Sequence, residues 1–304
     1  MFRSLRLALA LFLSAVALPF ITASVAAASV KPGCVVSLSP TATETLFAIG
    51  AGPQVQAVDK DSDFPRAGLP AKRIDSLNPS VEAVIGICKT SSSHSAKPDL
   101  VVISYDANQI KEKLTAVGVK VIEQEPPLNL AGALQQIKQL GTLTGHVKKA
   151  DALATSIKST IAKDIASVPK HSGKALTAYY ELDNTYYSLT SSTFVGSILK
   201  SLGVVNIADA KNTTADAGYP QLSAEYIVSA NPKMIFLADT ICCKASASTV
   251  AKRPGFSKVA AIADREVIGL NDDVASRWGP RLSLLVNELT ASVKSALKNS
   301  KLWK

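Results

Sequence analysis

The fold is decided by a stretch that occurs twice in the chain. Residues 97–104 read KPDLVVIS, and residues 231–237 read NPKMIFL. In both, a proline introduces an unbroken apolar run, which is typical of a parallel strand covered on both faces. The preceding segments also match, with SVEAVI at 80–85 and SAEYIV at 223–228. Their serines are suited to cap a short helix, and an acidic residue is favourable in its first turn. The repeat predicts two halves of the same design.

A second matching pair of segments lies upstream of each repeat. Each half begins with an apolar strand, continues with a helix that ends at glycine, and resumes with a strand. The expected segments are 34–39, 40–49 and 55–58 in the first half, and 175–180, 193–202 and 204–207 in the second. This alternation predicts an α/β fold with two doubly wound parallel-sheet lobes, each with helices on both faces of its sheet.

The segment between the halves has the pattern of one long helix. Residues 147–168 contain neither Gly nor Pro, their apolar residues recur every four positions, and Pro169 stops the pattern. We therefore expect an N-terminal lobe over 29–143, a connecting backbone helix over 144–170 and a C-terminal lobe over 171–304. A stiff helical hinge follows from that division.

The first 28 residues have the pattern of a signal peptide. Arg3 and Arg6 precede an apolar run over 7–21, and Ala26-x-Ala28 fits a cleavage site. The alternative is an uncleaved anchor, although the run is shorter than the roughly 20 residues of a membrane span. We expect an exported protein, in the periplasm or at the outer face of the cytoplasmic membrane.

The basic charge of the chain is spread thinly. The formal net charge is +9, and no run of basic residues is longer than Lys148-Lys149. A nucleic-acid partner is therefore not expected.

The four cysteines of an exported chain are expected to oxidise. Cys34 begins the first strand, and Cys88 lies in a nine-residue insertion, 86–94, that precedes another strand. Both belong at the amino-terminal edge of the sheet, so we predict a Cys34–Cys88 disulfide. Cys242 and Cys243 follow a strand, at the opposite edge, and form either a vicinal ring or bonds to two separate partners. The three histidines do not pair at metal-ligand spacing, so no metal site is expected.

Aromatic residues gather in loops that follow the expected strands. Ligands of open α/β sheets bind at the carboxyl ends of strands, and aromatic faces with hydroxyl tips suit a large, partly apolar ligand. The candidates are Phe64, Tyr105, Tyr180, Tyr187, Tyr219 and Trp278. Core packing is the alternative for such residues, above all for Tyr179 and Tyr186.

These features resemble the helical-backbone class of ABC-importer substrate-binding proteins, and within it the cobalamin receptors. The opening stretch 36–44, VSLSPTATE, and the stretch 97–101, KPDLV, carry the likeness together with the repeat. The resemblance implies a monomer without catalysis or a resident cofactor, which delivers cobalamin as transported ligand to a permease dimer with its ATPase subunits. Membrane contact is then made only through the permease.

The resemblance also implies roles for four residues. Glu82 and Glu225, at matching places in the repeat, would dock on arginines of the permease. The alternative is that both only favour a helix N-terminus. Asp273 and Arg277 match a pair that contacts ligand, although residues four apart also form intrahelical ion pairs.

Some features depart from the cobalamin receptors. Leu77 and Tyr105 stand where two tryptophans would fall, and the insertion and Cys242-Cys243 are unlike them. Haem or a ferric siderophore is therefore the alternative ligand. An envelope enzyme is the alternative from another class, but no nucleophile elbow, phosphate loop or dinucleotide fingerprint occurs.

Overall fold

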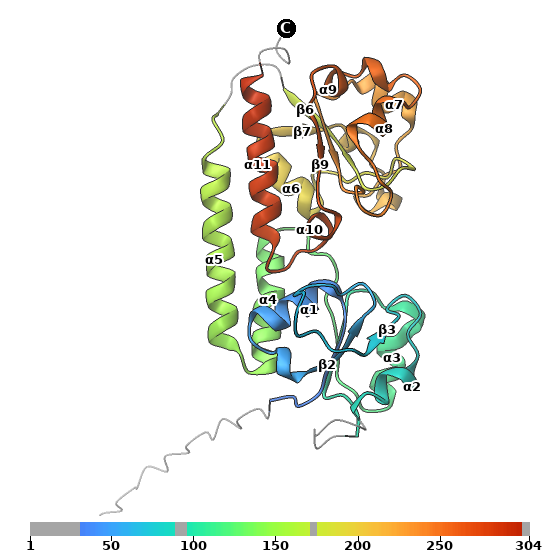
Figure 1. Ribbon diagram of the computed structural model, residues 1–304, viewed down its shortest axis with the longest axis vertical. Coiled ribbons are helices and arrows are strands. Elements are labelled where there is room, and N and C mark those ends of the chain that lie inside the picture. Colours follow the sequence, from blue (N-terminus) through green and yellow to red (C-terminus); the bar gives the residue numbers. More distant parts are fainter. Residues whose placement is uncertain (1–30, 89–95, 171–174, 300–304) are drawn as a thin grey trace, which may run out of the picture. The chain divides into compact units, whose positions relative to one another are not determined.

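The computed structural model describes residues 31–88, 96–170 and 175–299 (Figure 1). Within them lie two fully parallel sheets. The first sheet has the order β3-β2-β1-β4-β5, and the second has the order β7-β6-β8-β9. The strands are β1 (Val35–Leu38), β2 (Val55–Asp59), β3 (Arg73–Ile74), β4 (Leu100–Ile103), β5 (Val121–Glu123), β6 (Leu176–Glu181), β7 (Val204–Asn206), β8 (Met234–Leu237) and β9 (Val267–Gly269). Both predicted parallel-sheet lobes are confirmed.

Helices cover both faces of each sheet. Those of the first lobe are α1 (Pro40–Ala48), α2 (Val81–Ile85), α3 (Ile110–Ala116) and α4 (Leu130–Thr144). Those after the connecting helix are α6 (Phe194–Ser201), α7 (Ala224–Ala230), α8 (Ala247–Ala251), α9 (Ala260–Ala263), α10 (Asp272–Ser276) and α11 (Leu282–Lys298). Short 3₁₀ turns are η1 (Gly52–Gln54), η3 (Ala107–Gln109), η4 (Ile207–Lys211), η5 (Thr214–Asp216) and η6 (Phe256–Lys258).

Alternate residues of the two repeated strands enter different cores. Leu100 of β4 and Phe236 of β8 belong to one large apolar cluster. Val101 of β4 packs in a second cluster with residues of α2 and α3, and Ile235 of β8 packs in a third with residues of α7 and α8. This two-sided burial explains why the strands read as unbroken apolar runs.

The large cluster extends through both lobes. It unites Val35 of β1 with Met234 of β8 and includes Ile157 and Ile161 of α5 (Val147–Ala166). The connecting helix is not alone, because α4 and α11 also contribute to this cluster. A Cβ at Gly141 of α4 would lie 2.3 Å from the Cβ of Ala150 in α5, so glycine permits their close approach. A shared core favours small relative movements of the lobes.

The predicted disulfide is confirmed. Cys34 and Cys88 are bonded, with their Cα atoms 6.2 Å apart. Both are buried, and the backbone N–H groups of Gly33 and Cys34 donate to the carboxylate of Asp99. Residues 89–94 of the insertion lie outside the described residues.

We expect the Cys34→Ser/Cys88→Ser variant to lose about 2–5 kcal/mol of unfolding free energy, the usual cost of removing a native disulfide. Urea unfolding of the two proteins measures the difference. The matched control is the Cys242→Ser/Cys243→Ser variant, because the thiols that it replaces are exposed and free. Equal unfolding midpoints for the first variant and the wild type would contradict the assigned role of this bond.

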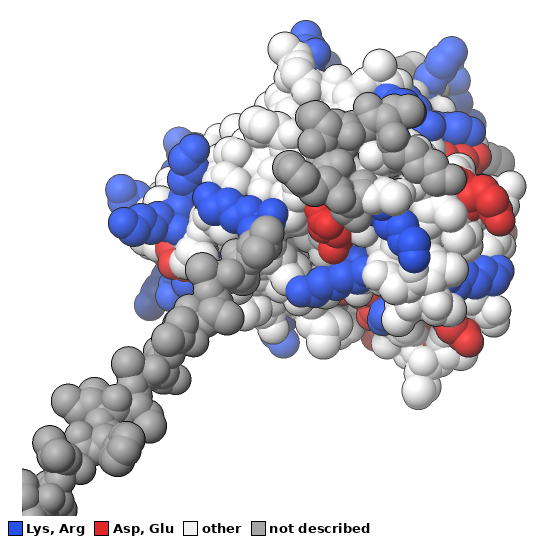
Figure 2. Space-filling model, turned by 90° about the horizontal axis from the view of Figure 1, so that it is seen from below, with Lys and Arg blue, Asp and Glu red and all other residues white. Residues whose placement is uncertain are grey.

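Charged side chains are mixed on the face in Figure 2, where Lys and Arg are interspersed with Asp and Glu and with uncharged residues. Among the described residues, no helix is both long and apolar enough to cross a membrane. The expected signal peptide lies outside the described residues.

Candidate ligand-binding site

A cleft of about 580 Å³ opens between segments of the two lobes. The first lobe lines it through residues that follow β1, β2 and β4, and the second through residues that follow β8 and β9. The lining residues are Ser39, Pro40, Thr41, Lys60, Asp61, Asp63, Ser104, Ile241, Asp273, Ser276, Arg277 and Trp278. This is the carboxyl edge of both sheets, where α/β folds bind ligands.

Buried hydroxyl groups shape the first-lobe wall. Ser39 caps α1, since its Oγ accepts from the N–H of Ala42 at 3.3 Å. The hydroxyl of Ser62 donates to the carboxylate of Asp59, which also accepts from the N–H of Asp61 at 2.9 Å. Burial raises the pKa of Asp59 despite these hydrogen bonds. These contacts hold the turn that presents Asp61 and Asp63 to the cleft.

Arg277 lines the cleft and joins the two lobes through its hydrogen bonds. Its Nη1 donates to Glu44 Oε1 at 2.9 Å and to Asp63 Oδ1 at 2.6 Å. Its Nη2 donates to the Asp61 carbonyl at 3.0 Å and to Asp273 Oδ1 at 2.6 Å. Each terminal nitrogen of a guanidinium carries two hydrogens, so all four are engaged. The side chain is only 7% exposed.

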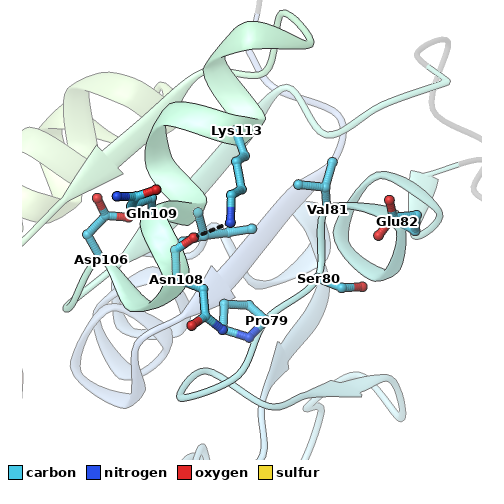
Figure 3. A pocket seen from close by; sticks show the side chains of 9 residues that line it. Pro79, Ser80, Val81, Glu82, Asp106, Asn108, Gln109 and Lys113 are labelled. Carbon is cyan, nitrogen blue, oxygen red and sulfur yellow. Dashed lines mark hydrogen bonds between the residues drawn. The ribbon is translucent and has the colours of Figure 1, made fainter.

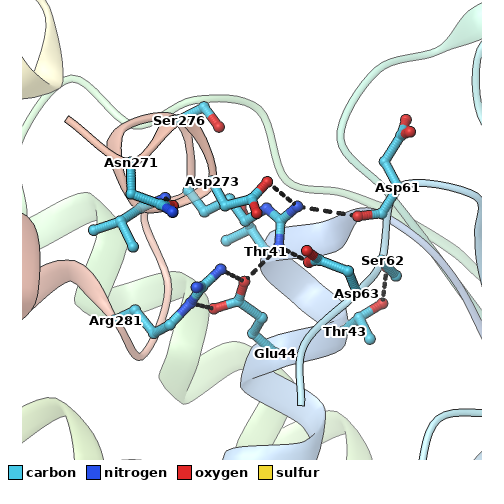
Figure 4. Close-up of polar contacts among 12 residues, drawn as sticks. Thr41, Thr43, Glu44, Asp61, Ser62, Asp63, Asn271, Asp273, Ser276 and Arg281 are labelled. Atoms are coloured by element: carbon cyan, nitrogen blue, oxygen red, sulfur yellow. Dashed lines mark hydrogen bonds and ion pairs between the residues drawn. The ribbon is translucent and has the colours of Figure 1, made fainter. Parts of the chain in front are cut away.

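Glu44 receives a second arginine from the other lobe. Arg281 Nε and Nη2 donate to the two carboxylate oxygens of Glu44 at 2.9 and 2.6 Å (Figure 4). The Glu44 side chain is 1% exposed, and the Arg281 guanidinium lies 4.6 Å from the Phe64 ring centroid. We call Glu44, Arg277 and Arg281 the interlobe brace.

The two aspartates that pair with Arg277, Asp63 and Asp273, differ in their proton affinity. Burial opposes ionisation of Asp63, but the Arg277 guanidinium lowers its pKa below the ordinary value. Burial and the neighbouring Asp63 carboxylate raise the pKa of Asp273 against the attraction of Arg277. The cleft floor is therefore rich in acceptors. Among the described residues, no cluster of three or more His, Cys, Asp or Glu side chains could hold a metal ion.

The structure brings some of the predicted ligand residues together. Asp273, Arg277 and Trp278 line the cleft, with Trp278 Nε1 donating to Gln136 Oε1 at 2.7 Å. Tyr105 follows the lining residue Ser104 and is 70% exposed, and Phe64 follows Asp63. Tyr187 and Tyr219 are exposed but do not line this cleft.

Tyr180 has a different place from the one the sequence suggested. It is 1% exposed and packs against Phe236, with ring centroids 6.2 Å apart. The expected strand ended at Tyr180, but β6 continues to Glu181, so Tyr180 is an interior strand residue whose side chain enters the core. Tyr179, on the opposite face of β6, is also buried.

Sequence reasoning missed several lining residues. Lys60, Asp61 and Asp63 follow β2 at the edge already assigned to Phe64, and Ile241 directly precedes Cys242. Their position after strands was the available signal. Glu44 ends the opening stretch 36–44, but nothing in the sequence indicates its arginine partners.

Glu82 and Glu225 occupy matching places. Ser80 Oγ accepts from the N–H of Ala83 and Ser223 Oγ accepts from the N–H of Tyr226, each at 3.1 Å. Each glutamate is thus the second residue of a capped helix, and both are exposed. Neither forms an ion pair with any described residue.

A second hollow of about 700 Å³ lies beside Glu82 (Figure 3). Its lining includes Asn108 and Gln109, whose φ angles of 55° and 56° are left-handed. Lys113 Nζ donates to the Asn108 carbonyl at 2.6 Å, and Asn108 Nδ2 donates to Asn78 Oδ1 at 2.9 Å. Hydrogen bonds thus stabilise an energetically unfavourable left-handed backbone conformation at Asn108, next to the candidate docking residue Glu82.

Known proteins resemble this chain over most of its length. An ABC transporter substrate-binding lipoprotein of Bacillus subtilis (strain 168), YvrC, is 32% identical over 273 residues, which cover 86% of this chain and 80% of that protein. A cobalamin-binding protein of Halobacterium salinarum is 28% identical over 259 residues, or 83% of this chain and 67% of that one.

A solved structure shares the fold. It is described as a possible iron-binding (periplasmic solute-binding) protein from Staphylococcus epidermidis ATCC 12228, with a TM-score of 0.72 and 26% identity over 86% of this chain and 99% of that one. A family model described as "Periplasmic binding protein" matches residues 35–274. The chain therefore belongs to the periplasmic binding protein family.

Proposed function

We propose that the chain captures cobalamin or a related corrinoid between its lobes and delivers it to an ABC importer. The chemistry of the cleft floor carries this proposal. Asp61, Asp63 and Asp273 line the cleft, whereas all hydrogens on the terminal nitrogens of Arg277 are engaged within the protein. The floor is suited to accept hydrogen bonds from a ligand rather than to donate them.

The side-chain amides of a corrinoid fit such a floor because each primary amide supplies two N–H donors. Ile241 and Trp278 add an apolar and an aromatic wall for the ring. An anionic ligand would instead need free cationic donors, because charged groups bury well only when paired. Lys60, which lines the cleft, already has a partner, because its Nζ lies 2.8 Å from Asp75 Oδ2. Cobalamin-binding and ABC-transporter relatives support both parts of the proposal.

Delivery rests on the matched glutamates. Two exposed carboxylates, one on each lobe, provide two-point contact with basic residues of a permease dimer. Such complementary charges fix orientation and accelerate encounter. ATP hydrolysis by the partner subunits would drive import, and this chain would act by binding alone.

Calorimetric titration with cyanocobalamin, haemin and a neutral ferric hydroxamate siderophore tests the ligand. We expect one-to-one binding of cyanocobalamin with a dissociation constant below about 1 μM, an affinity near −8 kcal/mol. Tight binding of haemin or the siderophore without cobalamin would replace the ligand in this proposal. The similarity to a possible iron-binding protein makes both compounds necessary arms of the experiment.

A further inference from the structure

An exposed turn beside the cleft carries two adjacent free thiols. Cys242 and Cys243 directly follow Ile241, which lines the cleft. The other two cysteines of the chain, Cys34 and Cys88, are already joined and buried. An exported, oxidised protein therefore holds one exposed pair of thiols at the edge of its candidate ligand site.

Hydrogen bonds connect this turn to the interlobe brace. The Asp272 carboxylate accepts from the N–H groups of Ile241 at 3.0 Å and Cys242 at 2.8 Å. The next residue, Asp273, binds Arg277 at 2.6 Å. The cysteine turn is therefore connected to the brace through Asp272, the peptide bond between Asp272 and Asp273, and the contact of Asp273 with Arg277.

The other side of the turn depends on the Cys242–Cys243 peptide itself. The N–H of Cys243 donates to the Asp239 carbonyl at 3.2 Å, and the N–H of Ala245 donates to the same oxygen at 3.2 Å. The two thiols also interact with each other. A hydrogen bond with Cys243, together with burial and the charge of Asp272, raises the pKa of Cys242 to about 12.

We propose that Cys242 and Cys243 form a redox site at which closure to a vicinal disulfide weakens ligand binding. The oxidant is a small-molecule disulfide. The Cys243 thiolate attacks it, because the raised pKa of Cys242 disfavours the Cys242 thiolate. A mixed disulfide forms and one small thiol is released. The neighbouring sulfur then displaces the second small thiol. Two protein thiols lose two electrons and two protons, and one small disulfide is reduced to two thiols.

The ring explains the expected loss of affinity. Closing a bond between adjacent cysteines creates an eight-membered ring that distorts the planar trans peptide between them. The N–H of Cys243 then leaves the Asp239 carbonyl, and Ile241 shifts in the cleft wall. We expect the oxidised form to bind cyanocobalamin roughly three- to tenfold more weakly, which is the typical effect of losing one hydrogen bond. The expected loss of ligand affinity rests on the proposed function, whereas formation of the disulfide ring does not.

Mass spectrometry and calorimetry together test the redox site. The purified protein is equilibrated with glutathione disulfide or with a low concentration of dithiothreitol. One portion of each form is alkylated with iodoacetamide and its mass is measured. Another portion of each form is titrated with cyanocobalamin. We expect two alkylated thiols after reduction and none after oxidation, with three- to tenfold weaker binding of the oxidised form. The buried Cys34–Cys88 bond is the internal control and should survive mild reduction.

The variant Cys242→Ser/Cys243→Ser should bind equally in both conditions. Thiols that stay alkylatable after oxidation, or a disulfide between two protein molecules, would overturn the redox site. A ring that closes with unchanged affinity would overturn its control of binding. If the ring closes but cyanocobalamin binds neither form, the proposed ligand fails, and the control of its binding fails with it, while the ring stands by mass alone.

Discussion

Replacing Glu44 with alanine is expected to lower the free energy of unfolding by about 3–5 kcal/mol, the cost of leaving buried charges without their partner. Arg277 is 7% exposed and Arg281 is 16% exposed, and both donate to this one carboxylate. Denaturant unfolding measured by circular dichroism gives the difference. Because the partners come from different lobes, we also expect a less cooperative transition.

Two comparisons make this prediction specific. Glu44→Gln keeps the oxygen acceptor without the charge and should lose less stability than Glu44→Ala. Asp75→Ala removes the ion-pair partner of Lys60. The Asp75 side chain is 42% exposed and that of Lys60 is 61% exposed, so this change should cost at most about 1 kcal/mol of unfolding free energy. If Glu44→Ala were no more costly than Asp75→Ala, the brace would not hold the lobes together.

The Glu82→Ala/Glu225→Ala double variant is expected to lose uptake while keeping its ligand affinity. Removing one partner of an interfacial charge pair costs about 2–5 kcal/mol, so each change should weaken permease binding by roughly 30-fold or more. Both residues are exposed and distinct from the cleft lining. Transport into vesicles that contain the importer gives uptake, and calorimetry gives the affinity for ligand.

Glu112→Ala is the matched control for docking. Glu112 is an exposed glutamate in the first turn of α3, on the same lobe as Glu82. It should retain full uptake. Wild-type uptake by the double variant would show that the two glutamates only favour their helix N-termini.

The sequence predicts the lobes well because the relevant signals are local. The runs LVVI and MIFL are buried on both faces, so their composition alone reveals a central parallel strand. The Cys34–Cys88 bond was also predictable, because the connectivity places both residues at one sheet edge.

The brace could not be predicted, because Arg277 and Glu44 are 233 positions apart and meet only when the lobes are assembled. Tyr180 shows a different limit. The expected strand ended at Tyr180, whereas β6 continues to Glu181, so Tyr180 lies inside the strand with its side chain in the core. Strand ends are the least certain part of a prediction from sequence. Asp273 and Arg277 line the cleft, and their contact with ligand stays a prediction, whereas the hydrogen bonds of Arg277 identify it as a brace residue.

A crystal structure of the complex with cyanocobalamin would show whether the ligand binds on the acidic floor of the cleft between the lobes. We expect the corrin ring between Ile241 and Trp278, with the side-chain amides of the ligand within hydrogen-bond distance of Asp61, Asp63 or Asp273 and with the Arg277–Glu44 contact intact. A corrinoid bound outside this cleft, or one held by an Arg277 that no longer contacts Glu44, would contradict this binding mode.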